Sequence, residues 1–119
     1  MDNDRENPLK IKSYAFALRS VKLYRYLCEQ NKEYVLSKQL LRSATSVGAN
    51  IAEANQAQSK ADFVHKLSIS LKEAVETEYW LNLLKDSEYL SETQFDSLIE
   101  DCNELIRMLT ASIKTAKRA

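Results

Sequence analysis

The sequence predicts an all-α protein, folded as an antiparallel up-down-up-down four-helix bundle. The chain of 119 residues holds one glycine and one proline, whereas a sheet protein needs turn residues after nearly every strand. Apolar side chains recur at spacings of three and four residues along four long segments, which is the period of an amphipathic helix. Short connections between such helices make neighbouring helices antiparallel. A rival arrangement, two long helical hairpins that complete their core on dimerisation, fits the same pattern.

Length and charge limit the classes of function. A chain of this length fits one domain, expected over residues 8–119 after a disordered tail over residues 1–7. Its 17 Lys and Arg balance 17 Asp and Glu, so no global charge attracts nucleic acid or an anionic membrane. Residues 8–30, however, contain five basic side chains and one acidic one. We therefore expect any anion-binding surface to involve the first helix.

Neither a membrane span nor a disulfide framework is expected. No run of about 18 apolar residues occurs, and residues 1–7 do not have the pattern of a signal peptide. Cys28 and Cys102 are too few for a set of disulfides and fall on apolar helix stripes, so we expect two buried free thiols. These features together predict a cytoplasmic protein.

The first helix is expected from about Pro8 to about Asn31, with Asn7 as its N-cap. Two apolar stripes run along this helix. The main stripe is expected to face the core and consists of Tyr14, Ala17, Leu18, Val21, Tyr24 and Cys28. The second stripe, Phe16, Leu23 and Leu27, lies on a different face. Because both faces cannot point into one core, we expect the second stripe at the interface of a homo-oligomer.

Three further helices follow. The second is expected over about 35–58, and its Gly48 would cost roughly 1 kcal/mol relative to alanine, which close approach of a neighbouring helix would offset. The third should begin after Ser59, in a capping box with Asp62, and run to about Lys85. The fourth should begin at a capping box formed by residues 91–94 and continue to the C-terminus.

No catalytic constellation is evident, so we expect a protein that is not an enzyme and binds no cofactor or metal. His65 is the one histidine, whereas a zinc site needs three or four ligands. Glu73, Glu76 and Glu78 could in principle bind a metal, but a solvated face or pairing with basic side chains explains them as well.

Two groups of residues are candidates for binding. Asn50 and Glu53 on the second helix could form a buried polar layer that fixes helix register, or a polar pocket for a partner. On the first helix, a face is shared by Lys12, Arg19, Lys22 and Tyr26. Cations with an aromatic among them suit phosphate binding and base stacking, although a solvated helix face would look the same.

The segment over residues 40–54, LLRSATSVGANIAEA, resembles the signature of the four-helix-bundle family known from intervening sequences of bacterial 23S ribosomal RNA genes. Asp62, Phe63 and the residues from Leu67 to Leu81 resemble the third helix of that family, and Lys12 to Ala17 fits its first helix. The resemblance covers nearly the whole chain from Pro8. It implies a homopentameric, barrel-like ring, and a relation to accessory proteins of diversity-generating retroelements, which bind a reverse transcriptase and nucleic acid through a basic surface.

These considerations leave two functional hypotheses. The first is an oligomeric scaffold that binds RNA or DNA, together with a protein partner such as a reverse transcriptase. The second is a purely protein-binding or structural homo-oligomer with no role for nucleic acid, which the neutral net charge favours.

Overall fold

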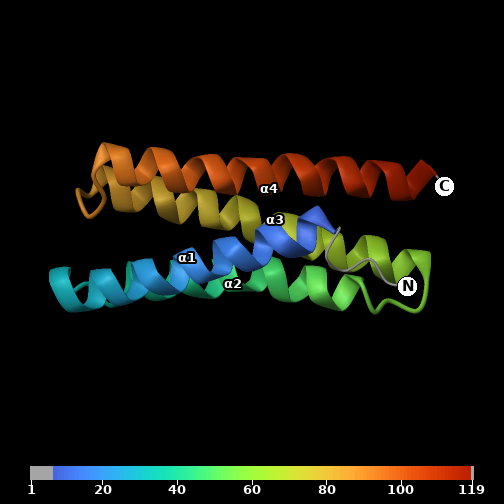
Figure 1. The fold of residues 1–119 in the computed structure, drawn as a ribbon, viewed down its shortest axis with the longest axis horizontal. Coiled ribbons are helices and arrows are strands. Elements are labelled where there is room, and N and C mark those ends of the chain that lie inside the picture. Colours follow the sequence, from blue (N-terminus) through green and yellow to red (C-terminus); the bar gives the residue numbers. More distant parts are fainter. Residues whose placement is uncertain (1–6, 119) are drawn as a thin grey trace.

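The computed structural model describes residues 7–118 and contains four helices (Figure 1). Their bounds are α1 Pro8–Asn31, α2 Leu36–Ala54, α3 Lys60–Asp86 and α4 Glu92–Arg118. Figure 1 shows that each helix runs opposite to the one before it, which confirms the expected all-α bundle. The bundle is elongated, 46 × 22 × 21 Å. The tail expected over residues 1–7 lies, apart from Asn7, outside the described residues, as does Ala119.

Three of the helices begin at the caps that the sequence predicts. The side chain of Asn7 accepts a hydrogen bond from the backbone N–H of Lys10 at 3.1 Å, and Ser59 accepts one from Asp62 at 3.0 Å. Ser91 and Gln94 form a reciprocal capping box at the start of α4, with bonds of 2.8 and 3.1 Å. Each bond satisfies a backbone donor that the first turn of a helix leaves free.

The start of α2 uses a different device, which the sequence reading missed. The side chain of Glu33, in the connection between α1 and α2, is buried, with 8% of its surface exposed. Its carboxylate accepts hydrogen bonds from three consecutive backbone N–H groups, those of residues 35, 36 and 37, at 2.7 to 3.0 Å. The carboxylate therefore caps the positive end of the α2 dipole. At its other end α2 stops at Ala54, four residues before the expected end.

The two stripes of α1 have the opposite roles from those expected. Phe16, Leu23 and Leu27, predicted at an oligomer interface, lie in the bundle core and are 2%, 8% and 0% exposed. Tyr14 and Leu18 of the predicted core stripe are 67% and 48% exposed. The prediction that Phe16, Leu23 and Leu27 form a subunit interface is therefore wrong, because the chain's own helices cover them.

Two serines explain the error. Ser13 and Ser20 continue the buried line of α1 and are 2% and 1% exposed. Their hydroxyls donate to backbone carbonyls one turn earlier in the same helix, at 3.2 and 3.0 Å, so burial leaves no polar group unsatisfied. A reading that counts only apolar side chains sees this line as interrupted.

The packing of the helices is uneven around the bundle. Helix α1 packs along α2, α2 along α3 and α3 along α4, whereas α1 and α4 meet over a much smaller region. The α1–α2 contact is close at Gly48, where a Cβ atom would lie 3.4 Å from the carbonyl oxygen of Ser13. This confirms that a neighbouring helix backbone approaches Gly48. The less tightly closed side, between α1 and α4, holds the candidate site.

Candidate nucleic-acid interface

The predicted basic stripe of α1 faces α4, and α4 holds two of its three cations. The guanidinium of Arg19 lies 2.6 Å from the carboxylate of Asp101, and the amine of Lys12 lies 3.3 Å from that of Glu104. Arg19 also donates to the hydroxyl of Ser97 at 2.9 Å. These contacts fix the two side chains and neutralise their charges, so Lys12 and Arg19 offer less to a phosphate than the sequence suggests.

The second half of the stripe is free of such partners. Within residues 7–118, Lys22 makes no ion pair, and neither does Arg25 one turn further along α1. Tyr26 is 45% exposed. Of the cations that line the α1–α4 side, Lys22 therefore keeps its charge unpaired, one turn from the accessible ring of Tyr26.

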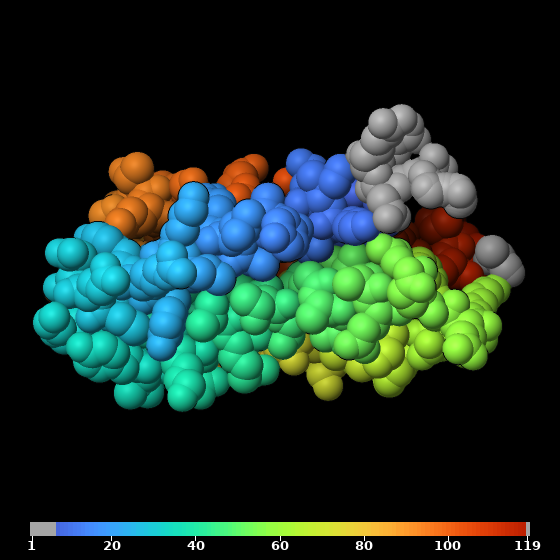
Figure 2. Space-filling view, turned by 60° about the horizontal axis from the view of Figure 1, so that its bottom comes forward, coloured from blue at the N-terminus to red at the C-terminus, as the bar shows by residue number. Residues whose placement is uncertain are grey.

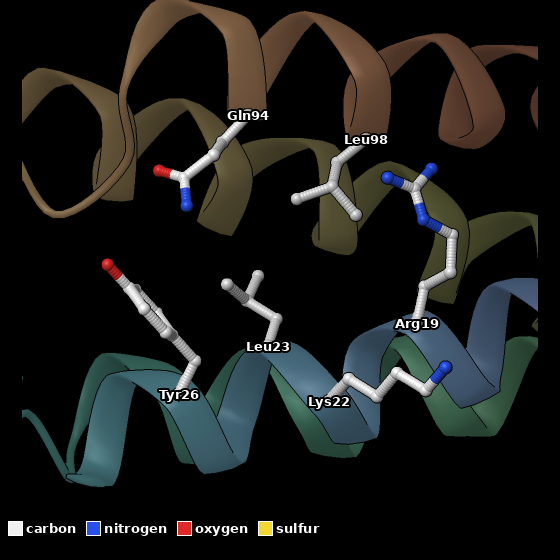
Figure 3. Close-up of a pocket in the computed structure, with 6 residues that line it drawn as sticks. All are labelled: Arg19, Lys22, Leu23, Tyr26, Gln94 and Leu98. Carbon is white, nitrogen blue, oxygen red and sulfur yellow. The ribbon is translucent and has the colours of Figure 1, made fainter. Parts of the chain in front are cut away.

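A groove of about 340 Å³ opens between α1 and α4 at this position. Three residues of the predicted stripe line it, together with leucines from both helices. The lining residues are Arg19, Lys22, Leu23, Tyr26, Gln94 and Leu98. Figure 3 shows Leu23 and Leu98 facing each other across the groove, with Tyr26 towards one end and Arg19 towards the other. The groove thus combines an apolar floor, an aromatic side and a cationic rim.

The other predicted polar site does not form. Asn50 is partly buried and donates from its amide to the carbonyl of Ser46 in its own helix at 2.9 Å. Glu53 has an exposed side chain and pairs with Lys66 on α3 at 2.8 Å. Asn50 and Glu53 therefore form no buried polar layer, because one side chain bonds its own helix and the other faces solvent.

The buried polar layer lies instead between the inner faces of α2 and α3. The hydroxyl of Thr77 donates to that of Ser43 at 2.8 Å, and both residues are fully buried. Ser70 of α3 donates to the carbonyl of Val47 on α2 at 2.8 Å. Short hydroxyl side chains at core spacing were the available signal, and they hold α2 and α3 in one register.

Two acidic residues of α3, Glu73 and Glu76, pair with a basic side chain of α2. Glu73 and Glu76 both pair with Arg42 of α2, and Glu76 also accepts a hydrogen bond from the indole of Trp80 at 3.0 Å. Hydrogen bonding from Arg42 and Trp80 holds the pKa of Glu76 below its ordinary value. His65 is exposed. Among the described residues, no three His, Cys, Asp or Glu side chains gather closely enough to hold a metal ion.

The two thiols differ in burial. Cys28 is only partly buried, whereas Cys102 is fully covered and donates to the carbonyl of Ala74 at 3.3 Å. Burial raises the pKa of Cys102 to about 12, so this thiol stays protonated at neutral pH. Both are free, as expected.

Large apolar side chains are exposed on two other faces. On α1 they are Ile11, Tyr14 and Leu18, which lie 49%, 67% and 48% exposed; on α3 they are Val75 and Tyr79, which lie 49% and 60% exposed. A groove between α1 and α2 lies beside Tyr14, and small side chains of α2 form its second wall. Figure 2 shows α1 lying along α2 on this face.

Within residues 7–118, no helix is both long enough and apolar enough to cross a membrane.

Comparisons with known proteins agree with this architecture. Residues 5–111 match the family described as 23S rRNA-intervening sequence protein. A solved structure from Bacteroides thetaiotaomicron VPI-5482, of a protein with unknown function from the S23 ribosomal protein family, is 55% identical in sequence and superposes with a TM-score of 0.90. The match covers 91% of this chain and 96% of that one. No curated protein matches the chain. The chain therefore belongs to the family of 23S rRNA-intervening sequence proteins.

Proposed function

We propose that this protein is a non-enzymatic, cytoplasmic homo-oligomeric scaffold that binds RNA or DNA through the α1–α4 side of its bundle. One observation carries the nucleic-acid part of the proposal: Lys22 and Tyr26 flank a groove with an apolar floor, and no carboxylate among residues 7–118 pairs with Lys22. Cationic and aromatic groups at a concave surface suit phosphates and bases, respectively.

Self-association strengthens this proposal. A neutral bundle with few unpaired cations binds a polyanion weakly, because each phosphate contact contributes only its own counterion release. Several copies in one ring would present the same side chains repeatedly to one strand. The exposed apolar residues of α1 and α3 supply surfaces for such assembly, since exposed apolar patches commonly mark protein–protein contacts. The family resemblance gives five as the number of subunits.

Light scattering coupled to size exclusion tests the assembly. We expect a mass several times that of one chain, and we expect the double substitution Tyr14→Glu and Leu18→Glu to reduce it. Both side chains are largely exposed, so the single bundle should still fold. Tyr34→Glu, which places a charge at another exposed tyrosine, is the matched control. A wild-type protein that stays monomeric over the working concentration range contradicts the proposal.

Binding of a labelled oligonucleotide at increasing salt tests the nucleic-acid role. We expect measurable binding at low salt, a steady loss as salt rises, and a further loss when Lys22 and Arg25 are both changed to Glu. Lys38→Glu, on an exposed part of α2, is a control that changes charge outside the groove. Wild-type protein that fails to bind at low salt refutes the role.

A purely protein-binding oligomer is the second candidate. The pairing of Lys12 and Arg19 with α4 favours it, because that pairing removes half of the apparent basic stripe. This candidate predicts that partners captured from cell extract, a reverse transcriptase among those to be sought, remain bound after nuclease treatment. The oligonucleotide titration separates the two candidates directly.

A further inference from the structure

We propose that the α1–α4 groove holds one unpaired nucleotide of a single strand, with its base against Tyr26 over the Leu23–Leu98 floor and its phosphate at Lys22. The inference rests on the proposed nucleic-acid role and adds what that role leaves open: the form of nucleic acid that is bound, and the place where a base enters the protein.

The shape of the groove fits a single nucleotide. Its volume of about 340 Å³ is at the lower end of the range of roughly 300 to 1,000 Å³ that small-molecule sites occupy. Leu23 and Leu98, 8% and 6% exposed, form the floor of the groove, and the neighbouring core residues cover most of each side chain. Tyr26, by contrast, keeps almost half of its surface free for stacking. A nucleobase, whose flat faces are apolar, can therefore enter above the floor and stack one face on Tyr26.

The polar groups around the floor are mainly hydrogen-bond donors. The side-chain oxygen of Gln94 already accepts the backbone N–H of Ser91 at 2.8 Å, and Figure 3 shows the amide nitrogen of Gln94 pointing towards the groove. Arg19 and Lys22 can only donate. Bases and phosphates present carbonyl, ring-nitrogen and phosphate-oxygen acceptors, so this lining complements a nucleotide in hydrogen bonding, and Lys22 adds an unpaired positive charge.

The position of the floor selects a single strand over a duplex. In a duplex each base is stacked and paired, so its ring cannot leave the helix to reach Leu23 and Leu98 without the cost of unstacking. An unpaired base pays much less of that cost. One unpaired lining cation, Lys22, is also too few for a duplex, whose affinity depends mostly on many phosphate contacts. An acidic peptide would satisfy Lys22, but an acidic side chain brings no flat ring for Tyr26.

The inference is tested with four fluorescein-labelled probes of equal length: oligouridylate, oligothymidylate, a mixed-sequence duplex and an abasic phosphodiester chain. Anisotropy titrations of the full-length protein at low salt compare their affinities. We expect the two single strands to bind more tightly than the duplex, and the abasic chain to bind least among the single strands. Comparison of oligouridylate with oligothymidylate separates RNA from DNA.

Substitution of Tyr26 locates the base. Loss of one stacked base is worth about 1 to 3 kcal/mol, so we expect Tyr26→Ala to weaken single-strand binding by roughly 5- to 150-fold. Tyr26→Phe, which keeps the ring, should bind nearly as the wild type does. Tyr34→Ala removes another exposed tyrosine, at the α1–α2 connection, and should leave affinity unchanged. Circular dichroism of each variant confirms that the bundle is intact. Photocrosslinking of a 5-iodouracil-labelled strand should attach to Tyr26.

Several results would overturn the inference. Equal affinity for the abasic chain or for the duplex would show that no unpaired base is read. Unchanged binding by Tyr26→Ala, or a crosslink on another helix face, would place the nucleic acid elsewhere while leaving the proposed function standing. Displacement of the strands by polyglutamate, with Tyr26→Ala weakening polyglutamate equally, would identify an acidic protein segment as the occupant. Wild-type protein that binds none of the probes refutes the inference and the nucleic-acid role together.

Discussion

Arg19 on α1 and Asp101 on α4 form an ion pair at 2.6 Å across the side of the bundle where the two helices pack least closely. The same two helices are joined again by Lys12 and Glu104 at 3.3 Å. These pairs hold α1 towards α4, and they also occupy cations that would otherwise face a phosphate backbone. An anionic ligand on this side would therefore compete with Asp101 and Glu104 for Arg19 and Lys12.

Removing the acidic partner of Arg19 should strengthen nucleic-acid binding. We expect Asp101→Asn to raise affinity several-fold at low salt and to steepen the dependence of log K on log salt by about one, because one more cation becomes free to release a counterion. Both side chains are roughly 40% exposed, so the variant should lose less than about 1 kcal/mol of stability. Anisotropy titrations across a salt series measure both quantities.

Asp96→Asn is the matched control for this prediction, because Asp96 is an exposed residue of α4 with no ion pair among residues 7–118. It removes the same unit of negative charge without releasing Arg19. If the two variants gain affinity equally, the gain comes from net charge alone, and the release of Arg19 has no special effect.

The assignment of the α1 stripes predicts a large difference in stability between two substitutions. Leu27 is fully buried, so Leu27→Ala should lower the free energy of unfolding by about 2 to 5 kcal/mol through lost burial and a residual cavity. Val35→Ala, at a site 71% exposed, should change it by no more than about 0.5 kcal/mol. Urea unfolding followed by circular dichroism gives both values. Equal and small losses in the two variants would contradict the placement of Leu27 in the core.

The sequence predicts the class and order of this fold well, because four long apolar patterns and three side-chain caps are local signals. The face of α1 that enters the core was not predictable in the same way. Ser13 and Ser20 lie in the core line of α1, and their role depends on how closely α1 and α2 approach, which local periodicity does not encode. The stripe that contains Tyr14 and Leu18 has more apolar residues, so a count of them selects the wrong face.

The site shows the same division between local and tertiary information. The shared face of Arg19, Lys22 and Tyr26 follows from helical spacing, and all three line one groove. Their neutralising partner Asp101 lies 82 residues away from Arg19 in the sequence. Such a partner becomes visible only when α4 is placed beside α1.

The buried hydroxyl pair between α2 and α3 should show measurable non-additivity. Ser43→Ala or Thr77→Val alone removes the cross-helix bond, and each should cost about 0.5 to 1.5 kcal/mol, because the remaining hydroxyl still donates to a carbonyl of its own helix. The double variant should lose clearly less than the sum of the two, because both polar groups are then gone. A double-mutant cycle from urea unfolding measures the coupling. Additive losses would show that the two hydroxyls do not act as a pair.

The cap on α2 predicts a pH-dependent contribution to stability. Burial acts to raise the pKa of Glu33, but the backbone N–H donors of the α2 terminus outweigh it and lower the pKa below its ordinary value of 4.5. A carboxylate with a lowered folded pKa stabilises the protein above the unfolded pKa, and this contribution is lost as pH falls through the folded value. Glu33→Gln should therefore cost about 1 to 2 kcal/mol at neutral pH.

The difference between wild type and Glu33→Gln should shrink steadily as the pH is lowered below about 4.5. Thermal or urea unfolding over a pH series measures this difference. Glu29→Gln, at an exposed position of α1, should show no comparable pH dependence. A constant gap between wild type and Glu33→Gln at every pH would mean that the charge of Glu33 plays no part in the cap.

The acidic edge of α4 behaves as a resident competitor for whatever approaches α1. Each phosphate that draws Arg19 or Lys12 away leaves a bare carboxylate facing the incoming strand, so the exchange gains little free energy. Isolated phosphates and polyanions that make only charge contacts should therefore bind weakly. A ligand that also makes a contact other than charge pairing, such as stacking, should stay bound longer. Intramolecular competition by the α4 carboxylates would then increase selectivity and lower overall affinity.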